Sequence, residues 1–366
     1  MEDTYTSPPR EYSDLALCIA QKIAKDKPID QISPPTQLWQ MYKDGKFGGI
    51  RRFPPGVDGA VFDVLKGVPD KVVYLSKSNK MPEEEYSEFE SYTMVRYDHI
   101  GMMTGMLIPK WDLDNCKGDD KLHDLVERKM VPLYTSCSNA LNRMMIRGAH
   151  SGREWVPGLV DYVRPVPSTD PDGGPIGGLS AVAGKAEWWR NQVEYFNAAF
   201  DTLYTASGTR DSRLFSDPAG SLTTLYQACC MNNDGEDGMP KMLWCNQTLY
   251  NMILNVPAQR QVFLNTQQNT NIPGPTPIRF QTADIVWDAS YPTMNAGEGE
   301  GMFLNPRSIG PFFTEGLDTF SFNGTKEKVP GRPGFYYPGS IQGGTWCSCM
   351  RDQGLIYGVK PSKTSP

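Results

Sequence analysis

The chain has 366 residues, of which 39% are hydrophobic and 21% are charged, values typical of a globular protein rather than a disordered or fibrous one. Its formal net charge is −6, which argues against a protein that reads nucleic-acid sequence, because such proteins usually carry a basic face. The 35 glycines and 30 prolines indicate many turns and long irregular connections.

The sequence shows no sign of a membrane or secretory route. It contains no run of 18 apolar residues, and its first residues, MEDTYTSPPREYSD, lack the basic and apolar regions of a secretion signal. We therefore expect a protein made in a cytoplasm. The eight cysteines are too sparse for a disulfide framework in a chain of this length, so buried, reduced thiols are expected.

The first 58 residues are predicted to form an arm rather than a compact unit. A short amphipathic helix is expected over Glu11–Ala24 and a second near Gln37–Lys43, with proline-broken segments between them and the basic pair Arg51 and Arg52 before FPPG. A segment of this kind becomes ordered by lying against another surface.

Between Val61 and Pro109 the apolar pattern changes towards a period of two, with Tyr92, Met94 and Arg96 in one extended run. The intervening SKSNKMPEEEYSE is polar and charged, so we predict a long two-stranded projection with an acidic tip or shoulder. Because an isolated hairpin is marginal in water, such a projection requires a partner surface. The alternative is a solvated loop with ordinary charges.

Lys121–Gly148 is predicted to form one long helix, because its apolar residues recur at steps of three and four. Asp119 or Asp120 can cap its start, and Gly148 can stop it. Pro132 lacks the backbone N–H that a helix interior needs, so the sequence predicts a kink there or two abutting helices.

The remaining chain mixes strands and helices and predicts an α+β fold with helices packed on a sheet. Trp155–Pro165 is predicted to be a strand, and Ser216 and Asp217 to start a helix over Pro218–Met231. KMLWCN should be a buried strand leading into a helix over TLYNMIL, with further strands at IRFQTADIVWD and GMFLN. The last three predicted strands, TFSFNG, GTWCSCM and GLIYGVK, should pair with one another or pack on the long helix.

Patterns that indicate catalysis or metal binding fail on inspection. The three histidines form no H-E-x-x-H pattern, and Cys347-x-Cys349, which would place both thiols on one face of a strand, lacks a second pair at ligand spacing. DLDNCKGDDKLH, from Asp112, lacks the glycine and the closing glutamate of a calcium loop. DPDGGPIGG is not followed by a phosphate-binding lysine. We therefore expect no catalytic residue, no metal and no cofactor, in a chain built for contacts.

One segment resembles a known family. GGLSAVAGKAEWWRNQV, residues 177–193, is similar to the part of tailed-bacteriophage major capsid proteins in which a glycine-serine turn precedes an aromatic-Trp-Arg-Asn-Gln run. The elements that follow, ending in the W…C…R…QG of GTWCSCMRDQGLI, occur in the order of that family. The resemblance covers residues 177–357, and residues 60–148 fit in outline.

The resemblance implies the Hong Kong 97 fold. It assigns residues 1–58 to an N-terminal arm and 59–110 to an extended loop with adjoining peripheral strands. Residues 111–148 would hold the spine helix of the peripheral domain, 149–310 an axial domain, and 311–366 the returning peripheral strands and the C-terminal tail.

The function implied is a major capsid protein, not an enzyme, that assembles with itself as pentamers and hexamers. The shell would enclose the double-stranded DNA of a tailed bacteriophage without sequence-specific binding, in a virion assembled in the host cytoplasm. A separate scaffolding protein, a portal and decoration or cement proteins are the expected partners. The alternatives are an encapsulin-like nanocompartment shell and, in another class, a cytosolic α+β enzyme or binding protein, which only the glycine-rich loops and aromatics such as Trp188 and Trp189 favour.

Charged side chains in the arm and the projection are the candidate intersubunit contacts: Arg51, Arg52, Lys77, Lys80, Glu83, Glu84, Glu85 and Arg96. Some family members crosslink a loop lysine to an asparagine near a glutamate. Lys77 or Lys80 with Asn323 and Glu327 would fill those roles here, although the registers are not established and many members do not crosslink.

Overall fold

The computed structural model describes residues 37–45, 49–54, 59–65, 92–115, 119–151, 154–196, 221–230, 238–254, 278–315, 321–322, 327–328 and 334–359. Several predicted features lie outside these residues: the helix at 11–24, the tip with its lysines and glutamates at 77–85, the helix start at 216–218, and Asn323.

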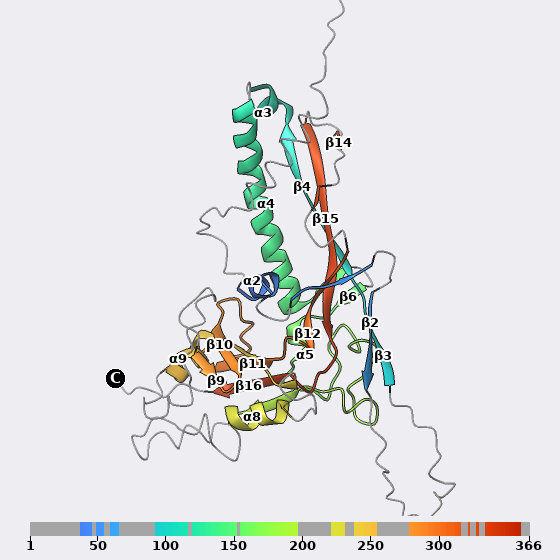
Figure 1. Ribbon diagram of the computed structural model, residues 1–366, viewed down its shortest axis with the longest axis vertical. Helices are drawn as coiled ribbons and strands as arrows, with labels where there is room; N and C mark the ends of the chain where they lie inside the picture. The colour runs from blue at the N-terminus through green and yellow to red at the C-terminus, as the bar shows by residue number, and fades with distance from the viewer. Residues whose placement is uncertain are drawn as a thin grey trace, which may run out of the picture.

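A six-stranded sheet forms the elongated part of the molecule (Figure 1). Its central strand, β15 (Gly334–Cys347), pairs antiparallel with β4 (Ile100–Pro109) over ten residue pairs, from Gly334↔Pro109 to Gly343↔Ile100. Along its other edge, β15 pairs antiparallel with three short strands: β14 (Glu327–Lys328), β13 (Ser321–Phe322) and β12 (Ile309–Thr314). Strand β12 in turn pairs in parallel with β1 (Arg51–Phe53), a strand of the arm.

The long helix α4 (Asp119–Arg147) runs beside β4 and β15 for 29 residues (Figure 1), which confirms the predicted helix. Gly148 ends it in the left-handed conformation, at φ 72°, and its N–H donates to the carbonyl oxygen of Met144 at 2.8 Å. The helix continues through Pro132 without interruption, so two abutting helices are excluded, while the bend stays a prediction. At its N-terminal end, Lys129 forms an ion pair of 3.0 Å with Asp112 of α3 (Lys110–Asn115).

The strand predicted over Trp155–Pro165 is wrong after Val156. A hairpin of β5 (Ala149–Ser151) and β6 (Glu154–Val156) is followed by the short helix α5 (Leu159–Tyr162). The N–H of Gly158 donates to Asp161 Oδ2 at 2.8 Å, and this cap starts a helix that the apolar pattern alone does not reveal.

A second six-stranded sheet lies below the first in Figure 1. Its strands, in spatial order, are β7 (Gln192–Tyr195), β16 (Gly354–Val359), β11 (Gly299–Leu304), β8 (Met242–Cys245), β10 (Ala283–Trp287) and β9 (Ile278–Phe280). The predicted strand IRFQTADIVWD is thus two strands, β9 and β10. Strand β13 pairs with β15 at Gly339 and Ser340, ahead of the predicted GTWCSCM, and the expected pairing is wrong for β16, which pairs with β11 and β7.

Both faces of the second sheet are buried, and alternate residues of its strands enter two cores. Leu243 and Cys245 of β8 face α8 (Leu222–Cys229) and α9 (Gln247–Leu254), whereas Met242 and Trp244 join the core shared with the first sheet. Helix α8 begins at Leu222 in the described residues. Ser221 is its cap, because its Oγ accepts a hydrogen bond of 3.2 Å from the N–H of Thr224.

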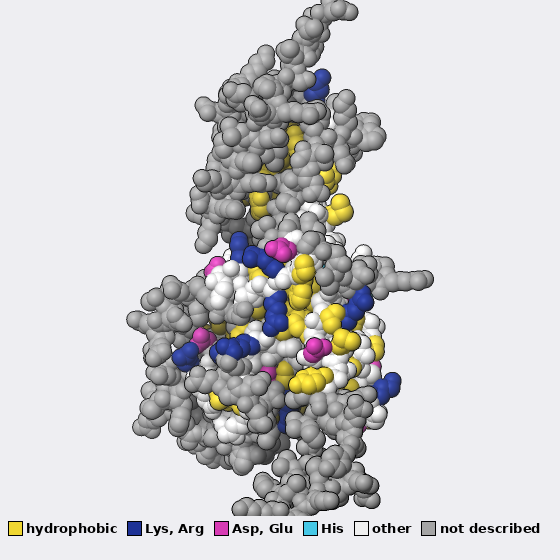
Figure 2. All heavy atoms as spheres, turned by 45° about the vertical axis from the view of Figure 1, so that its right-hand side comes forward, with side chains coloured by type: hydrophobic (Ala, Val, Ile, Leu, Met, Phe, Trp, Pro, Cys, Tyr) yellow, Lys and Arg dark blue, Asp and Glu magenta, His cyan; other side chains and the backbone are white. Residues whose placement is uncertain are grey.

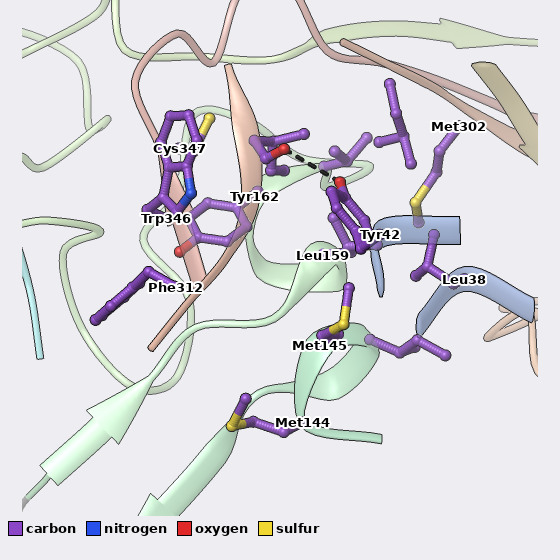
Figure 3. Close-up of a cluster of buried hydrophobic side chains, with 14 of the residues drawn as sticks. Leu38, Tyr42, Met144, Met145, Leu159, Tyr162, Met302, Phe312, Trp346 and Cys347 are labelled. Atoms are coloured by element: carbon purple, nitrogen blue, oxygen red, sulfur yellow. Dashed lines mark hydrogen bonds between the residues drawn. The ribbon is translucent and has the colours of Figure 1, made fainter. Parts of the chain in front are cut away.

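The shared core joins the two sheets into one packed unit (Figure 3). Helix α2 (Gln37–Lys43), which the sequence predicted, contributes Leu38 and Tyr42, and Tyr42 donates a hydrogen bond of 3.1 Å to the carbonyl oxygen of Ile309. The end of α4 contributes Met144 and Met145. None of the helices within the described ranges is both long and apolar enough to cross a membrane.

Candidate intersubunit surface

The predicted projection begins as an antiparallel ribbon of β2 (Ala60–Leu65) and β3 (Tyr92–Tyr97), with Ala60 opposite Tyr97 and Leu65 opposite Tyr92. Alternate residues point to opposite faces of a strand pair. The inward face carries side chains that are fully or partly buried: Ala60, Phe62, Val64, Thr93, Val95 and Tyr97. The outward face carries exposed ones: Val61, Asp63, Tyr92, Met94 and Arg96.

The outward face is largely apolar. Tyr92 is 69% exposed, Met94 71% and Val61 46%, so three large apolar side chains stand side by side in solvent. A soluble protein seldom leaves such a group uncovered unless another surface contacts it. The ribbon would also be only marginally stable by itself, because an isolated two-stranded hairpin is marginal in water.

The inward face fixes the ribbon to the first sheet through aromatic contacts. Phe62 stacks on Trp346 with ring centroids 4.8 Å apart and planes inclined by 20°, and it meets Phe53 of β1 edge-on at 6.0 Å. Tyr97 donates a hydrogen bond of 2.5 Å to the carbonyl oxygen of Cys347. Burial raises the pKa of the Tyr97 hydroxyl well above its ordinary value, so it stays a neutral donor.

The glycine-rich loop after Pro171 closes against β3. The N–H of Arg96 donates to the carbonyl oxygen of Gly177 at 3.3 Å. Gly177 has φ 61°, and a Cβ there would lie 2.0 Å from Val95 Cγ1, so only glycine fits. This segment, first recognised by its resemblance to capsid proteins, therefore supports the ribbon from the side.

The Trp-Arg-Asn-Gln run that carried the resemblance is structural in this fold. Trp189 is buried in the core and packs edge-on against Trp188 at 5.6 Å. Arg190 Nε donates to the carbonyl oxygen of Ala181 at 2.8 Å, and Asn191 Nδ2 donates to that of Arg164 at 3.0 Å. These contacts fold the loop over 164–191, and the adjacent tryptophans are accounted for by packing.

Three of the candidate contact residues lie in the described part of the chain, and their surroundings differ. Arg96 projects from the outward face of the ribbon and forms an exposed ion pair of 3.6 Å with Asp98. Arg51 lies over the ring of Trp346, with its Cζ 3.7 Å from the ring centroid, and partial burial lowers the pKa of its guanidinium. Arg52 is exposed on the same strand. Their roles between subunits stay predictions.

The sequence predicted Tyr92 and Met94 to lie in a strand but did not identify them as contact residues. They are the most exposed apolar side chains of the ribbon. The period of two contained this information, because it places both on one face with Arg96. Met103 of β4 and Trp111 of α3 are further exposed apolar residues, at 76% and 68%. Figure 2 shows apolar side chains interleaved with Lys, Arg, Asp and Glu side chains on the face that it turns to the viewer.

The cysteines that the structure describes offer no reactive site. The six within the described ranges are free thiols, as expected, and burial raises the pKa of Cys347 well above its ordinary value and that of Cys137 to about 11. Cys347 ends β15 and Cys349 lies beyond it, so the predicted shared strand face is wrong. In the part of the chain that the structure describes, no three His, Cys, Asp or Glu side chains are placed to hold a metal ion.

Comparison with known proteins places the fold. No family model and no curated protein matches the sequence. Among solved structures, the capsid of a native GTA particle matches at a TM-score of 0.56 and 11% identity, over 91% of this chain and 93% of that one. The capsid of cyanophage A-1(L) matches at 0.55 and 12%, over 91% and 96%. An encapsulin complex from Synechococcus elongatus matches at 0.51 and 10%, over 93% of each chain.

The chain therefore has the α+β fold of phage capsid proteins, which confirms the resemblance at the level of the fold. The match runs over nearly the whole of both chains and includes an encapsulin. These structural neighbours are shell proteins, which are structural proteins rather than enzymes. At identities of 10% to 12%, the fold persists although few individual side chains are shared.

Proposed function

We propose that this protein is the major capsid protein of a tailed bacteriophage, which assembles with itself into an icosahedral shell of pentamers and hexamers around double-stranded DNA. The observation that carries the proposal is a fold shared with capsid proteins over more than nine tenths of the chain. A closed shell also supplies every subunit with neighbours in fixed positions, which the exposed ribbon requires.

The outward face of the ribbon is the contact surface that we propose. Val61, Tyr92 and Met94 supply apolar area, and the opposite charges of Asp63, which is paired with Met94, and Arg96, which is paired with Val61, lie among them. Protein interfaces commonly combine apolar area with polar and charged groups in this way. A neighbouring subunit would cover the apolar side chains and leave the charges to fix the register.

The domain roles follow from the two sheets. The sheet around β15 and the helix α4 would form the peripheral domain, with α4 as its spine, and the sheet around β8 and β11 the axial domain. Strand β16 would then belong to the axial domain by its pairing, so the C-terminal stretch returns from one domain to the other. Residues 1–58 would be the arm, of which α2 and β1 hold fixed places on the core.

The net charge of −6 suits a container for DNA. Each phosphate that a protein neutralises adds affinity through counterion release, and a shell that gripped its genome would hinder packaging and release. We therefore propose that the shell encloses DNA without sequence-specific binding. A separate scaffolding protein, a portal and decoration or cement proteins complete the proposed virion, assembled in the host cytoplasm.

A nanocompartment shell is the second candidate, because the encapsulin complex matches over the same share of the chain. Native particles separate the two candidates. We expect nuclease-protected double-stranded DNA of uniform length inside purified particles, measured by gel electrophoresis after protease treatment. Particles that hold a protein cargo and no DNA would contradict the phage assignment and favour the nanocompartment.

A further inference from the structure

The ribbon that carries the proposed contact surface is attached to the molecule by side chains rather than by strand pairing. Within the described residues, β2 and β3 pair with each other and with no other strand. Aromatic packing of Phe62 on Trp346 and Phe53 and the hydrogen bond from Tyr97 hold its inward face. The direction of the ribbon therefore depends on these contacts and on the hydrogen bond from the N–H of Arg96 to the carbonyl oxygen of Gly177.

We propose that Arg51 is a positioning residue that fixes the angle at which the β2–β3 ribbon leaves the first sheet. The arm strand β1 would thereby control how the ribbon presents its outward face to a neighbouring subunit. This inference rests on the proposed assembly function for its consequence, although the positioning itself is a property of the single chain.

Three side chains from three segments meet at the base of the ribbon. The guanidinium carbon of Arg51 in β1 lies 3.7 Å from the ring centroid of Trp346 in β15 and 5.2 Å from that of Phe62 in β2. Trp346 and Phe62 are themselves stacked at 4.8 Å. Each group thus contacts the other two, and a change in the position of Phe62 would disturb both of its partners.

The chemistry of the stack depends on the planar guanidinium. In the described part of the chain, no carboxylate forms an ion pair with Arg51, so the aromatic faces are the groups that hold its charge. Trp346 is only 2% exposed, and its Nε1 has no hydrogen-bond partner in the same part of the chain. Arg51 itself stays partly in solvent, so one face of its guanidinium is covered by the buried indole, and Lys lacks the flat surface that Arg presents.

The position of β1 explains why this residue can act on the ribbon. Arg51 is opposite Phe312 in the parallel pairing of β1 with β12, and Phe53 follows on the same face to pack against Phe62. Arg52 points to the other face of the strand. One short strand of the arm therefore supplies two side chains to the base of the ribbon, and removing β1 from β12 would release both.

The test compares Arg51→Ala and Arg51→Lys with Arg52→Ala, a control that removes the same charge from the next residue. Hydrogen exchange is measured on the full-length chain below the concentration at which shells form. In Arg51→Ala we expect the amides of residues 60–65 and 92–97 to exchange about 2-fold to 30-fold faster, from the strength of such a stack. Arg51→Lys should fall between this variant and wild type, and Arg52→Ala should change the exchange of the ribbon less than Arg51→Ala does.

The strands β8 and β11 serve as an internal reference, because they lie in the second sheet. Unchanged exchange in the ribbon of Arg51→Ala, or an equal acceleration in β8 and β11, would overturn the positioning role. Light scattering then follows assembly, which we expect to be slower in Arg51→Ala than in wild type. If wild-type protein itself never forms shells, the proposed function fails, and the exchange result still decides the role of Arg51.

Discussion

Glu300 of β11 is a buried carboxylate that organises the loop before its own strand. Its two oxygens accept hydrogen bonds from the N–H groups of Met294 and Asn295 at 2.7 and 2.8 Å. Burial raises the pKa of Glu300 above its ordinary value of 4.5, and these two hydrogen bonds counteract part of the rise. Its charged form is therefore costly in the folded state although its geometry is well satisfied.

This raised pKa predicts a pH dependence of stability. Between pH 4.5 and the higher folded-state pKa, the native protein holds more protons than the unfolded chain. The contribution of Glu300 to the free energy of unfolding is therefore complete below pH 4.5 and is lost as the pH rises. Glu300→Gln removes the titration at nearly constant shape. We expect the melting temperature of wild type minus that of Glu300→Gln to fall as the pH rises from about 4 to 7. A difference that stays constant or rises would contradict the assignment.

At the scale of elements, helix α4 was the most predictable part of the fold. Its apolar periodicity and the glycine stop are local signals, and they predicted its ends to within two residues of Asp119 and Arg147. The ribbon was predictable in the same way, from a period of two. Strand β16 was not, because its partners in β7 and β11 lie far away in sequence, and no local pattern states which strands will meet.

The contact surface was predictable only in part. The projection and its need for a partner followed from the pattern, but the candidates were chosen by charge, and the apolar group of Val61, Tyr92 and Met94 was not singled out. Arg51 could not be placed either, because its contacts with Phe62 and Trp346 join segments far apart in sequence. Such contacts depend on the tertiary fold.

Pro132 allows a test of the helix itself. It lies exposed inside α4, so Pro132→Ala restores a backbone donor without opening a cavity in the core. Pro costs about 3 kcal/mol relative to Ala in a helix interior, so we expect the variant to be more stable by roughly 1 to 3 kcal/mol in urea unfolding. A loss of stability would show that the packing of α4 requires the bend expected at Pro132.

At the scale of the whole molecule, the outward face of the ribbon should matter for assembly and not for folding. Met94 is 71% exposed but is paired with Asp63, so Met94→Asp, which places two carboxylates opposite each other, should lower the free energy of unfolding by no more than about 1 kcal/mol. It should abolish shell formation measured by light scattering, because the interface would bury an unpaired charge.

Met94→Leu is the matched control, since it keeps an apolar side chain of similar size at the same place. It should fold and assemble like wild type. If Met94→Asp forms shells with unchanged yield, the ribbon is not part of the contact surface. If Met94→Leu does not form shells, the site tolerates no change of shape.

The central claim, that this chain builds a closed shell, is tested most directly by electron microscopy of the purified full-length protein over a range of concentrations, with co-expressed scaffolding protein where one is encoded beside it. We expect closed particles of uniform diameter with pentameric and hexameric units on their surface. A monomer that is stable at every concentration, with and without scaffold, would contradict the claim.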